Sequence, residues 1–201
     1  FYLVADRQKK TFTKEDKDKR FHQLLIAKNA DGYKNLVKLC SLGYTEGMYG
    51  KYPRVDKELI LKYHKNLIAT TCCIGAEVPQ TILKKGEAEG RKVFEWWYDL
   101  FGEDYYIELQ RHGMGEQDKV NEVLLKFAKE YKVKVIATND SHYVDQKDSN
   151  AHDILLCINT GEKQSTPTFK EFSDDDVQQK GKRFAFFNDQ FYFKTQAEMA
   201  A

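Results

Sequence analysis

The feature that most constrains this fold is a regular alternation of strand-like and helix-like segments along 201 residues. Short apolar runs, which predict strands, are separated by longer segments that repeat apolar residues at helical spacing. This order is typical of parallel βαβ units, and it favours an open α/β sheet or an α/β barrel. The strands are expected at residues 1–5, 21–27, 66–72, 105–109 and 133–138.

Helices are expected between and after these strands. Apolar periodicity predicts them at 31–42, 116–131 and 148–159. Either Asn29 or Asp31 suits the N-cap of the first helix. Residues 79–101 are expected to form two helical pieces broken near Gly86 and Gly90.

Composition limits the classes of protein to which the chain can belong. Apolar residues make up 41% and charged residues 31%, which suits a globular protein with a buried core. The net charge of +1 gives no global attraction to nucleic acid or membrane, so any DNA contact must come from a local patch. No apolar run approaches the roughly 18 residues of a membrane span. Four cysteines, two of them adjacent, favour a reducing cytoplasm over a disulfide framework.

Residues that could carry chemistry follow the last expected strand. The run "VKVIAT" leads directly into Asn139, Asp140 and His142. In an extended chain, residues two positions apart point the same way, so Asp140 and His142 would share one side beyond the strand's carboxyl end. Active sites of α/β folds are built at that end, and Asp with His suits a divalent metal. Alternatively, Asp140 caps the next segment and His142 is a loop histidine.

Three other strand ends offer similar residues: His22, then Cys72, Cys73 and Glu77, then Glu108, Gln110 and His112. Each has a structural alternative. Adjacent cysteines are often buried apolar residues, Glu77 could complement a helix N-terminus, and His112 could be a turn residue. Taken together, the four strand ends predict a metal site at one mouth of an α/β barrel.

Four long blocks resemble consecutive parts of one family. They read "FHQLLIAKNADGYKNLVKLCSLGYTEGMYGKYPRVDKELI", "TTCCIGAEVPQ", "YYIELQRHGMGEQ" and "VIATNDSHYVDQKDSNAHDILLCINTG". The family is the PHP (polymerase and histidinol phosphatase) domain in the form found in the bacterial replicative DNA polymerase III α subunit. The resemblance covers almost the whole chain, in the family's order and spacing.

The resemblance implies an α/β fold, a PHP-type distorted (β/α)7 barrel that is N-terminally truncated here. The PHP domain would occupy residues 1–160, and a polar connector, where periodicity stops, residues 161–186. Residues 187–201, with "FYFKTQAEM", resemble the start of the passage toward the polymerase core. The opening "FYLVADRQKK" begins inside a strand pattern, so we expect the chain to be cut from a longer one.

The resemblance also implies roles for individual residues. In the family, nine side chains hold up to three divalent metals. Matching positions here make metal ligands of His22, Cys73, Asp140 and His142, the last two also catalytic. Arg54 and His112 match residues near the substrate phosphate, and Glu77 and His152 match residues that support the ligands. Zinc is the expected metal, with manganese or magnesium as alternatives. The other five family ligands are not in this sequence, so the fragment alone is expected to be inactive.

The implied function is that of a segment of a template-directed DNA polymerase. Within it, a complete PHP site would be a metal-dependent phosphodiesterase that proofreads as a 3′→5′ exonuclease. Expected partners are DNA and other holoenzyme subunits, including the proofreading subunit and the sliding clamp, in the cytoplasm and without a membrane. One alternative is a non-catalytic scaffold that braces the polymerase and docks a separate proofreading subunit. A free-standing PHP phosphatase is disfavoured by the polymerase-type blocks.

Overall fold

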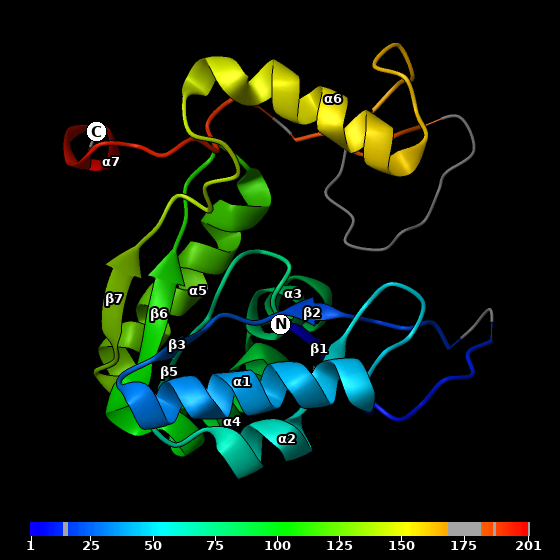
Figure 1. Ribbon diagram of the computed structural model, residues 1–201. Coiled ribbons are helices and arrows are strands. Elements are labelled where there is room, and N and C mark those ends of the chain that lie inside the picture. The colour runs from blue at the N-terminus through cyan, green and yellow to red at the C-terminus, as the bar shows by residue number, and fades with distance from the viewer. Residues whose placement is uncertain (14–15, 169–181, 187, 201) are drawn as a thin grey trace. The chain divides into compact units, whose positions relative to one another are not determined.

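The computed structural model describes residues 1–13, 16–168, 182–186 and 188–200 (Figure 1). They form two compact units. The first unit comprises Phe1–Leu109 with Gly115–Ile136, and the second comprises Gln110–Met114 with Ala137–Ala201. Much of the expected connector, residues 169–181, lies outside the described residues. Among the described residues, no helix is long and apolar enough to cross a membrane.

The described residues contain seven short strands in two sheets. The three-stranded sheet has the order β2-β1-β4, with bounds Phe21–His22, Tyr2–Val4 and Arg54–Asp56. The four-stranded sheet has the order β3-β5-β6-β7, with bounds Leu25–Ala27, Leu67–Thr70, Tyr105–Leu109 and Lys134–Ala137. Parallel pairs join β1 to β4 and β5 to β6, whereas β1–β2 and β3–β5 are antiparallel. The protein therefore has mixed α/β architecture.

Five helices belong to the first unit: α1 Ala30–Thr45, α2 Lys57–Tyr63, α3 Glu77–Lys85, α4 Glu87–Phe101 and α5 Gly115–Tyr131. The second unit contains α6 Ser149–Thr160 and α7 Gln196–Ala200. Single 3-10 turns, η1 and η2, occupy Gly102–Asp104 and Gln146–Asp148. Asn29 caps α1, because its side chain accepts hydrogen bonds from two backbone N–H groups of the first turn. Gly86, at φ +88°, separates α3 from α4.

The core of the first unit is rich in aromatic residues. Phe94 and Trp97 of α4 and Phe127 of α5 are almost fully buried, and the Phe94 ring lies 5.4 Å from that of Tyr105 on β6. Burying one such side chain contributes about 1.5–3 kcal/mol relative to leaving it exposed. This packing holds β5 and β6 against α4. It therefore fixes the positions of the residues from which the loops after these strands begin.

Several expectations need correction. The expected strand at 21–27 is two strands in different sheets, because Gln23 leaves the ladder and its side chain donates to the carbonyl oxygens of Leu24 and Thr70. The sheets are not purely parallel. No helix lies between β1 and β2 among the described residues, and a chain that returns without a crossover helix pairs antiparallel. Gly90 lies inside α4, so only Gly86 breaks the helical pair.

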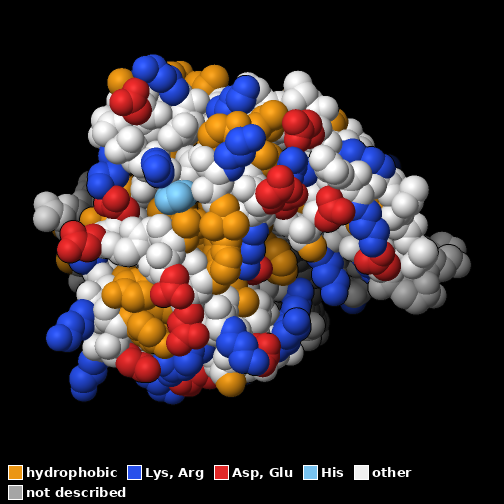
Figure 2. Space-filling view, turned by 90° about the horizontal axis from the view of Figure 1, so that it is seen from below, with side chains coloured by type: hydrophobic (Ala, Val, Ile, Leu, Met, Phe, Trp, Pro, Cys, Tyr) orange, Lys and Arg blue, Asp and Glu red, His pale blue; other side chains and the backbone are white. Residues whose placement is uncertain are grey.

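One face of the surface is seen in Figure 2. Hydrophobic side chains gather in several groups there, separated by Lys, Arg, Asp and Glu side chains of both signs. This mixture agrees with the near-neutral net charge, and no extended area of one sign covers this face.

Candidate functional site

In the first unit, two of the expected ligands lie side by side. The imidazole Nδ1 of His22, on β2, is 3.4 Å from the Sγ of Cys73, in the loop after β5. A bridge between His22 and Ala76 brings the loop against β2, and the His22 N–H donates to the carbonyl oxygen of Gly75. A tetrahedral zinc bound by one imidazole and one thiolate places these donor atoms about 3.6 Å apart. The observed separation is close to that of two ligands of one zinc ion, and it also matches a hydrogen bond between the imidazole and the thiol.

The backbone of the Cys73 loop is held in an unusual conformation. Cys72 has φ +57°, in the left-handed region that non-glycine residues rarely adopt. The Cys72 N–H donates to Thr70 Oγ1, and that hydroxyl donates to the buried carboxylate of Glu108 on β6. Strain of this kind persists only where the surroundings fix it, and it is concentrated at functional sites.

Glu77, expected to support the ligands, begins α3 four residues after Cys73. Its carboxylate accepts a hydrogen bond from Trp97 Nε1 at 3.1 Å and pairs with Lys57 Nζ at 2.9 Å. Burial, followed by the charge of Glu77, raises the pKa of the neighbouring Tyr105 hydroxyl. The structure thus shows the alternative role, a carboxylate at a helix N-terminus, and support of the ligands stays a prediction.

In the second unit, Asp140 and His142 lie in the turn after β7. Asp140 has φ +44°, so the chain is not extended there, and strand alternation does not set the directions of the two side chains. The Nδ1 of the exposed His142 lies 2.6 Å from the carbonyl oxygen of Asp140. Because a carbonyl oxygen only accepts, Nδ1 carries the proton and Nε2 presents the lone pair that a metal requires.

Two more expected residues lie in this unit, together with two phenylalanines. Buried His112 is stacked on Phe191 at 4.0 Å, and His152 of α6 is stacked on Phe186 at 4.7 Å. The Nε2 of His112 lies 3.0 Å from the carbonyl oxygen of Asn139, one residue before Asp140. Burial lowers the pKa of His152, the neighbouring His142 lowers it further, and Asp153 opposes both.

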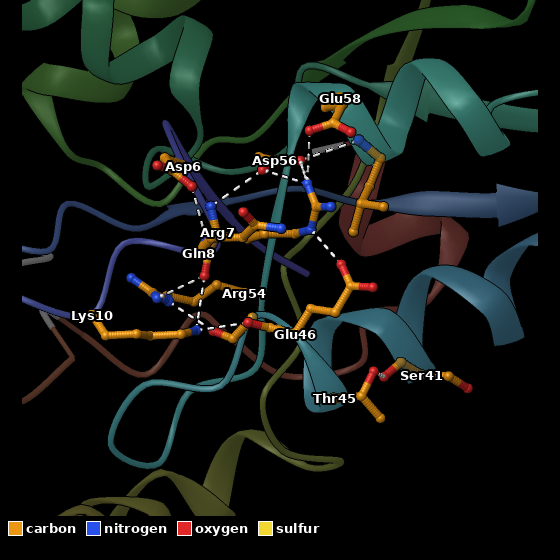
Figure 3. A network of polar contacts seen from close by, with 12 residues as sticks. Asp6, Arg7, Gln8, Lys10, Ser41, Thr45, Glu46, Arg54, Asp56 and Glu58 are labelled. Carbon is orange, nitrogen blue, oxygen red and sulfur yellow. Dashed lines mark hydrogen bonds and ion pairs between the residues drawn. The ribbon is translucent and has the colours of Figure 1, made fainter.

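Arg54, expected near a phosphate, has no exposed surface (Figure 3). Its guanidinium pairs with Asp18 Oδ1 at 2.7 Å and donates to the carbonyl oxygens of Gly47, Arg7 and Lys9. These bonds tie the segment after β1 to the end of α1. Contact with a phosphate would require some of them to be exchanged, and the role stays a prediction.

Residues 4–112 match the model of the PHP domain family, which is more than half of the chain. The chain belongs to the PHP domain family. The matched range includes the His22–Cys73 pair and Glu77, and it ends at His112.

Three curated relatives of the chain carry the name DNA polymerase III subunit alpha. The protein from Borreliella burgdorferi is 43% identical over 179 residues, which is 89% of this chain and 14% of the relative. The Deinococcus radiodurans protein is 42% identical over 89% of this chain and 12% of its own length. The Thermus aquaticus protein is 42% identical over 90% of this chain and 14% of its own length. The chain therefore spans between 12% and 14% of the length of these relatives.

The expected residues of the PHP domain fall into two sets. One set, in the first unit, comprises His22, Arg54, Cys73 and Glu77, and the other, in the second unit, comprises His112, Asp140, His142 and His152. Within the described part of the chain, no three His, Cys, Asp or Glu side chains lie close enough together to hold a metal ion. The His22–Cys73 pair is thus the most developed element of a metal site.

Sequence reasoning missed one polar network in the PHP domain (Figure 3). The buried guanidinium of Arg7 pairs with buried Asp56 at 2.9 Å and also with Glu46 and Glu58. Asp56 additionally caps α2, since its side chain accepts from Leu59 N–H. An acidic residue before an apolar helical repeat is a helix-start pattern and could have revealed Asp56, whereas nothing local marks Arg7.

Proposed function

We propose that this PHP domain is a segment of a bacterial DNA polymerase III α subunit, a template-directed DNA polymerase. The proposal is supported by relatives of that name, 42–43% identical over about nine tenths of this chain. DNA and the other holoenzyme subunits, including the proofreading subunit and the sliding clamp, are then its partners, in the cytoplasm. The PHP resemblance further suggests a distorted (β/α)7 barrel, of which this chain supplies part.

Within that polymerase, the PHP domain is proposed to bind divalent metal, with zinc preferred, and to hydrolyse phosphodiesters as a 3′→5′ exonuclease. The observation that carries the proposal is the 3.4 Å approach of His22 Nδ1 to Cys73 Sγ. A thiolate with an imidazole selects zinc over magnesium. Bound metal would lower the pKa of a water molecule and stabilise charge on the phosphoryl oxygens.

The remaining roles fall to the chain's own residues. Asp140 and His142 are proposed as further ligands, and the proton on His142 Nδ1 leaves Nε2 as the donor atom. His112 and Arg54 are proposed to orient the phosphate, and Glu77 and His152 to support the ligands. Five further family ligands are missing from this sequence, so the 201-residue chain by itself is expected to lack exonuclease activity.

A second candidate function is a scaffold without chemistry. It is favoured by the contacts of Glu77 and Arg54, whose charged groups already bond to other residues of the same chain. In this case the domain braces the polymerase and docks a proofreading subunit. Exonuclease activity of the full polymerase separates the two functions, because a scaffold can also hold zinc as a structural ion.

The deciding experiment measures metal bound to the purified chain by mass spectrometry after dialysis against metal-free buffer. Cys73→Ser is compared with Cys40→Ser, since Cys40 is an exposed cysteine on α1. Close to one zinc per chain, lost in Cys73→Ser and kept in Cys40→Ser, would support the metal-binding function. Equal zinc in both variants would refute Cys73 as a ligand. In the full polymerase, Asp140→Asn should abolish PHP exonuclease activity and spare DNA synthesis.

A further inference from the structure

Four aromatic rings form a continuous stack in the second unit. Their order is His152, Phe186, Phe191 and His112, with successive centroid distances of 4.7, 4.6 and 4.0 Å and interplanar angles of 16°, 24° and 14°. The ring of His142 lies against this stack, 4.6 Å from Phe186 and 6.0 Å from Phe191. Phe186 and Phe191 thus separate His112 from His152, whereas the rings of His142 and His152 lie 5.8 Å apart.

Residues 190–192, next to and including Phe191, form hydrogen bonds with the turn that contains Asp140 and His142. The His142 N–H donates to the carbonyl oxygen of Phe191 at 2.8 Å. On the other side, Asn139 Nδ2 donates to the carbonyl oxygens of Gln190 and Tyr192, each at 2.7 Å. A non-glycine residue at φ +44° costs of order 1–3 kcal/mol and persists only when its surroundings fix it. These bonds supply that constraint.

We propose that Phe186 and Phe191 are positioning residues for His142 and for the Asp140 turn. They fix the imidazole plane of His142 and so present its Nε2 in one direction. The inference rests on the proposed metal-binding function, in which His142 is a ligand. It also moves the boundary of the functional domain, because the site would need residues up to Phe191 and not end at residue 160.

At Phe186 the contact pattern argues against simple core packing, whereas Phe191 is 4% exposed and also packs as a core residue. Phe186 is only half-buried and His142 is exposed, so little apolar surface is removed from water where they meet. Aromatic pairs of this kind contribute about 0.5–1.5 kcal/mol beyond their buried area, which is enough to restrict a ring's rotamers. Groups that orient a metal-binding histidine commonly change metal affinity 10–100-fold when they are replaced.

The test uses Phe186→Leu and Phe191→Leu, with Phe193→Leu as the matched control. Phe193 lies in the same segment and is 76% exposed. NMR would follow the Hε1 resonance of His142, which the Phe186 ring current shifts, and hydrogen exchange of the His142 amide. Titration with Zn²⁺ gives the metal affinity.

Both Leu variants should move the Hε1 resonance of His142 toward its random-coil position and speed exchange of the His142 amide at least tenfold. Their Zn²⁺ affinity should fall about tenfold, and Phe193→Leu should change none of these.

Further variants separate positioning from folding and from the proposed function. Phe186→Tyr keeps the ring and should restore the wild-type resonance. Hydrogen exchange of the α6 amides reports folding of the second unit, and if Phe191→Leu loses structure there, Phe186→Leu decides alone. Unchanged His142 resonance and exchange in folded Phe186→Leu would overturn the inference. If the wild-type chain binds no Zn²⁺, the proposed function fails, while the NMR data still decide whether Phe186 positions His142.

Discussion

The Nδ1 of His22 and the Sγ of Cys73 lie 3.4 Å apart, although 51 positions separate the two residues in the chain. β2 is only two residues long, and its bridge to Ala76 brings the Cys73 loop beside His22. The approach therefore depends on tertiary structure and not on a local motif. A nitrogen and a sulfur at this separation match two ligands of one tetrahedral zinc ion.

Zinc should protect the Cys73 thiol from alkylation. A thiolate bound to metal is a poorer nucleophile than a free one, and the metal also blocks access to the sulfur. With stoichiometric Zn²⁺, iodoacetamide modification of Cys73 should slow at least tenfold, whereas modification of exposed Cys40 should not change. Peptide mass spectrometry over time measures both rates. His22→Ala should remove most of the protection, and equal protection with and without His22 would show that the pair does not share a metal.

Breaking the buried pair of Arg7 and Asp56 should destabilise the first unit strongly. Both side chains are only 7% exposed, so removal of one leaves the charge of the other without its buried partner. Such losses cost about 3–5 kcal/mol, and we expect this for Arg7→Met and Asp56→Asn in urea unfolding. Glu58, which is 77% exposed, provides the control, and Glu58→Gln should cost within about 0.5 kcal/mol. A double variant no worse than either single variant would confirm the coupling, whereas additive losses would contradict it.

Local patterns predicted the longer elements well. The helices α5 and α6 and the strand β6 lie within one residue of their expected positions, because periodicity over ten or more residues, or a dense apolar run, is a local property. The strand β4 and the helix α2 were missed. Three and seven residues are too few for a period to show, and Arg54–Asp56 owes its conformation to pairing with β1.

The candidate site was less predictable from pattern alone. Alternation along a strand was expected to align Asp140 with His142, but φ at Asp140 is +44° and the chain turns there. The approach of His22 to Cys73 was implied by the family resemblance, since no spacing rule links residues 51 positions apart. The ring stack that includes Phe186 and Phe191 had no sequence pattern, because it joins segments from three parts of the chain.

The stability of the second unit should depend on Asp153 at acid pH. Hydrogen bonds from Arg183 hold the pKa of Asp153 below its ordinary value. A depressed folded-state pKa stabilises the fold above the unfolded-state value, about 3.9, and this stabilisation is lost as pH falls through the folded-state pKa. Asp153→Asn should therefore destabilise α6 at pH 6 and much less at pH 2. Hydrogen exchange of α6 amides at both values measures the difference, and an equal effect at both would contradict the assignment.

Removal of the Tyr105 hydroxyl should not destabilise the protein. Tyr105 is 1% exposed, and its hydroxyl oxygen has no hydrogen-bond partner in the described structure. An unsatisfied buried polar group costs about 1–3 kcal/mol, so Tyr105→Phe should leave the free energy of unfolding unchanged or raise it by up to that amount. Tyr131 offers the matched contrast, because its hydroxyl donates to Glu95 and accepts from Arg91. Tyr131→Phe should lower stability by about 0.5–1.5 kcal/mol in the same urea titration. A loss of 1 kcal/mol or more in Tyr105→Phe would mean that a bound water or ligand satisfies the hydroxyl.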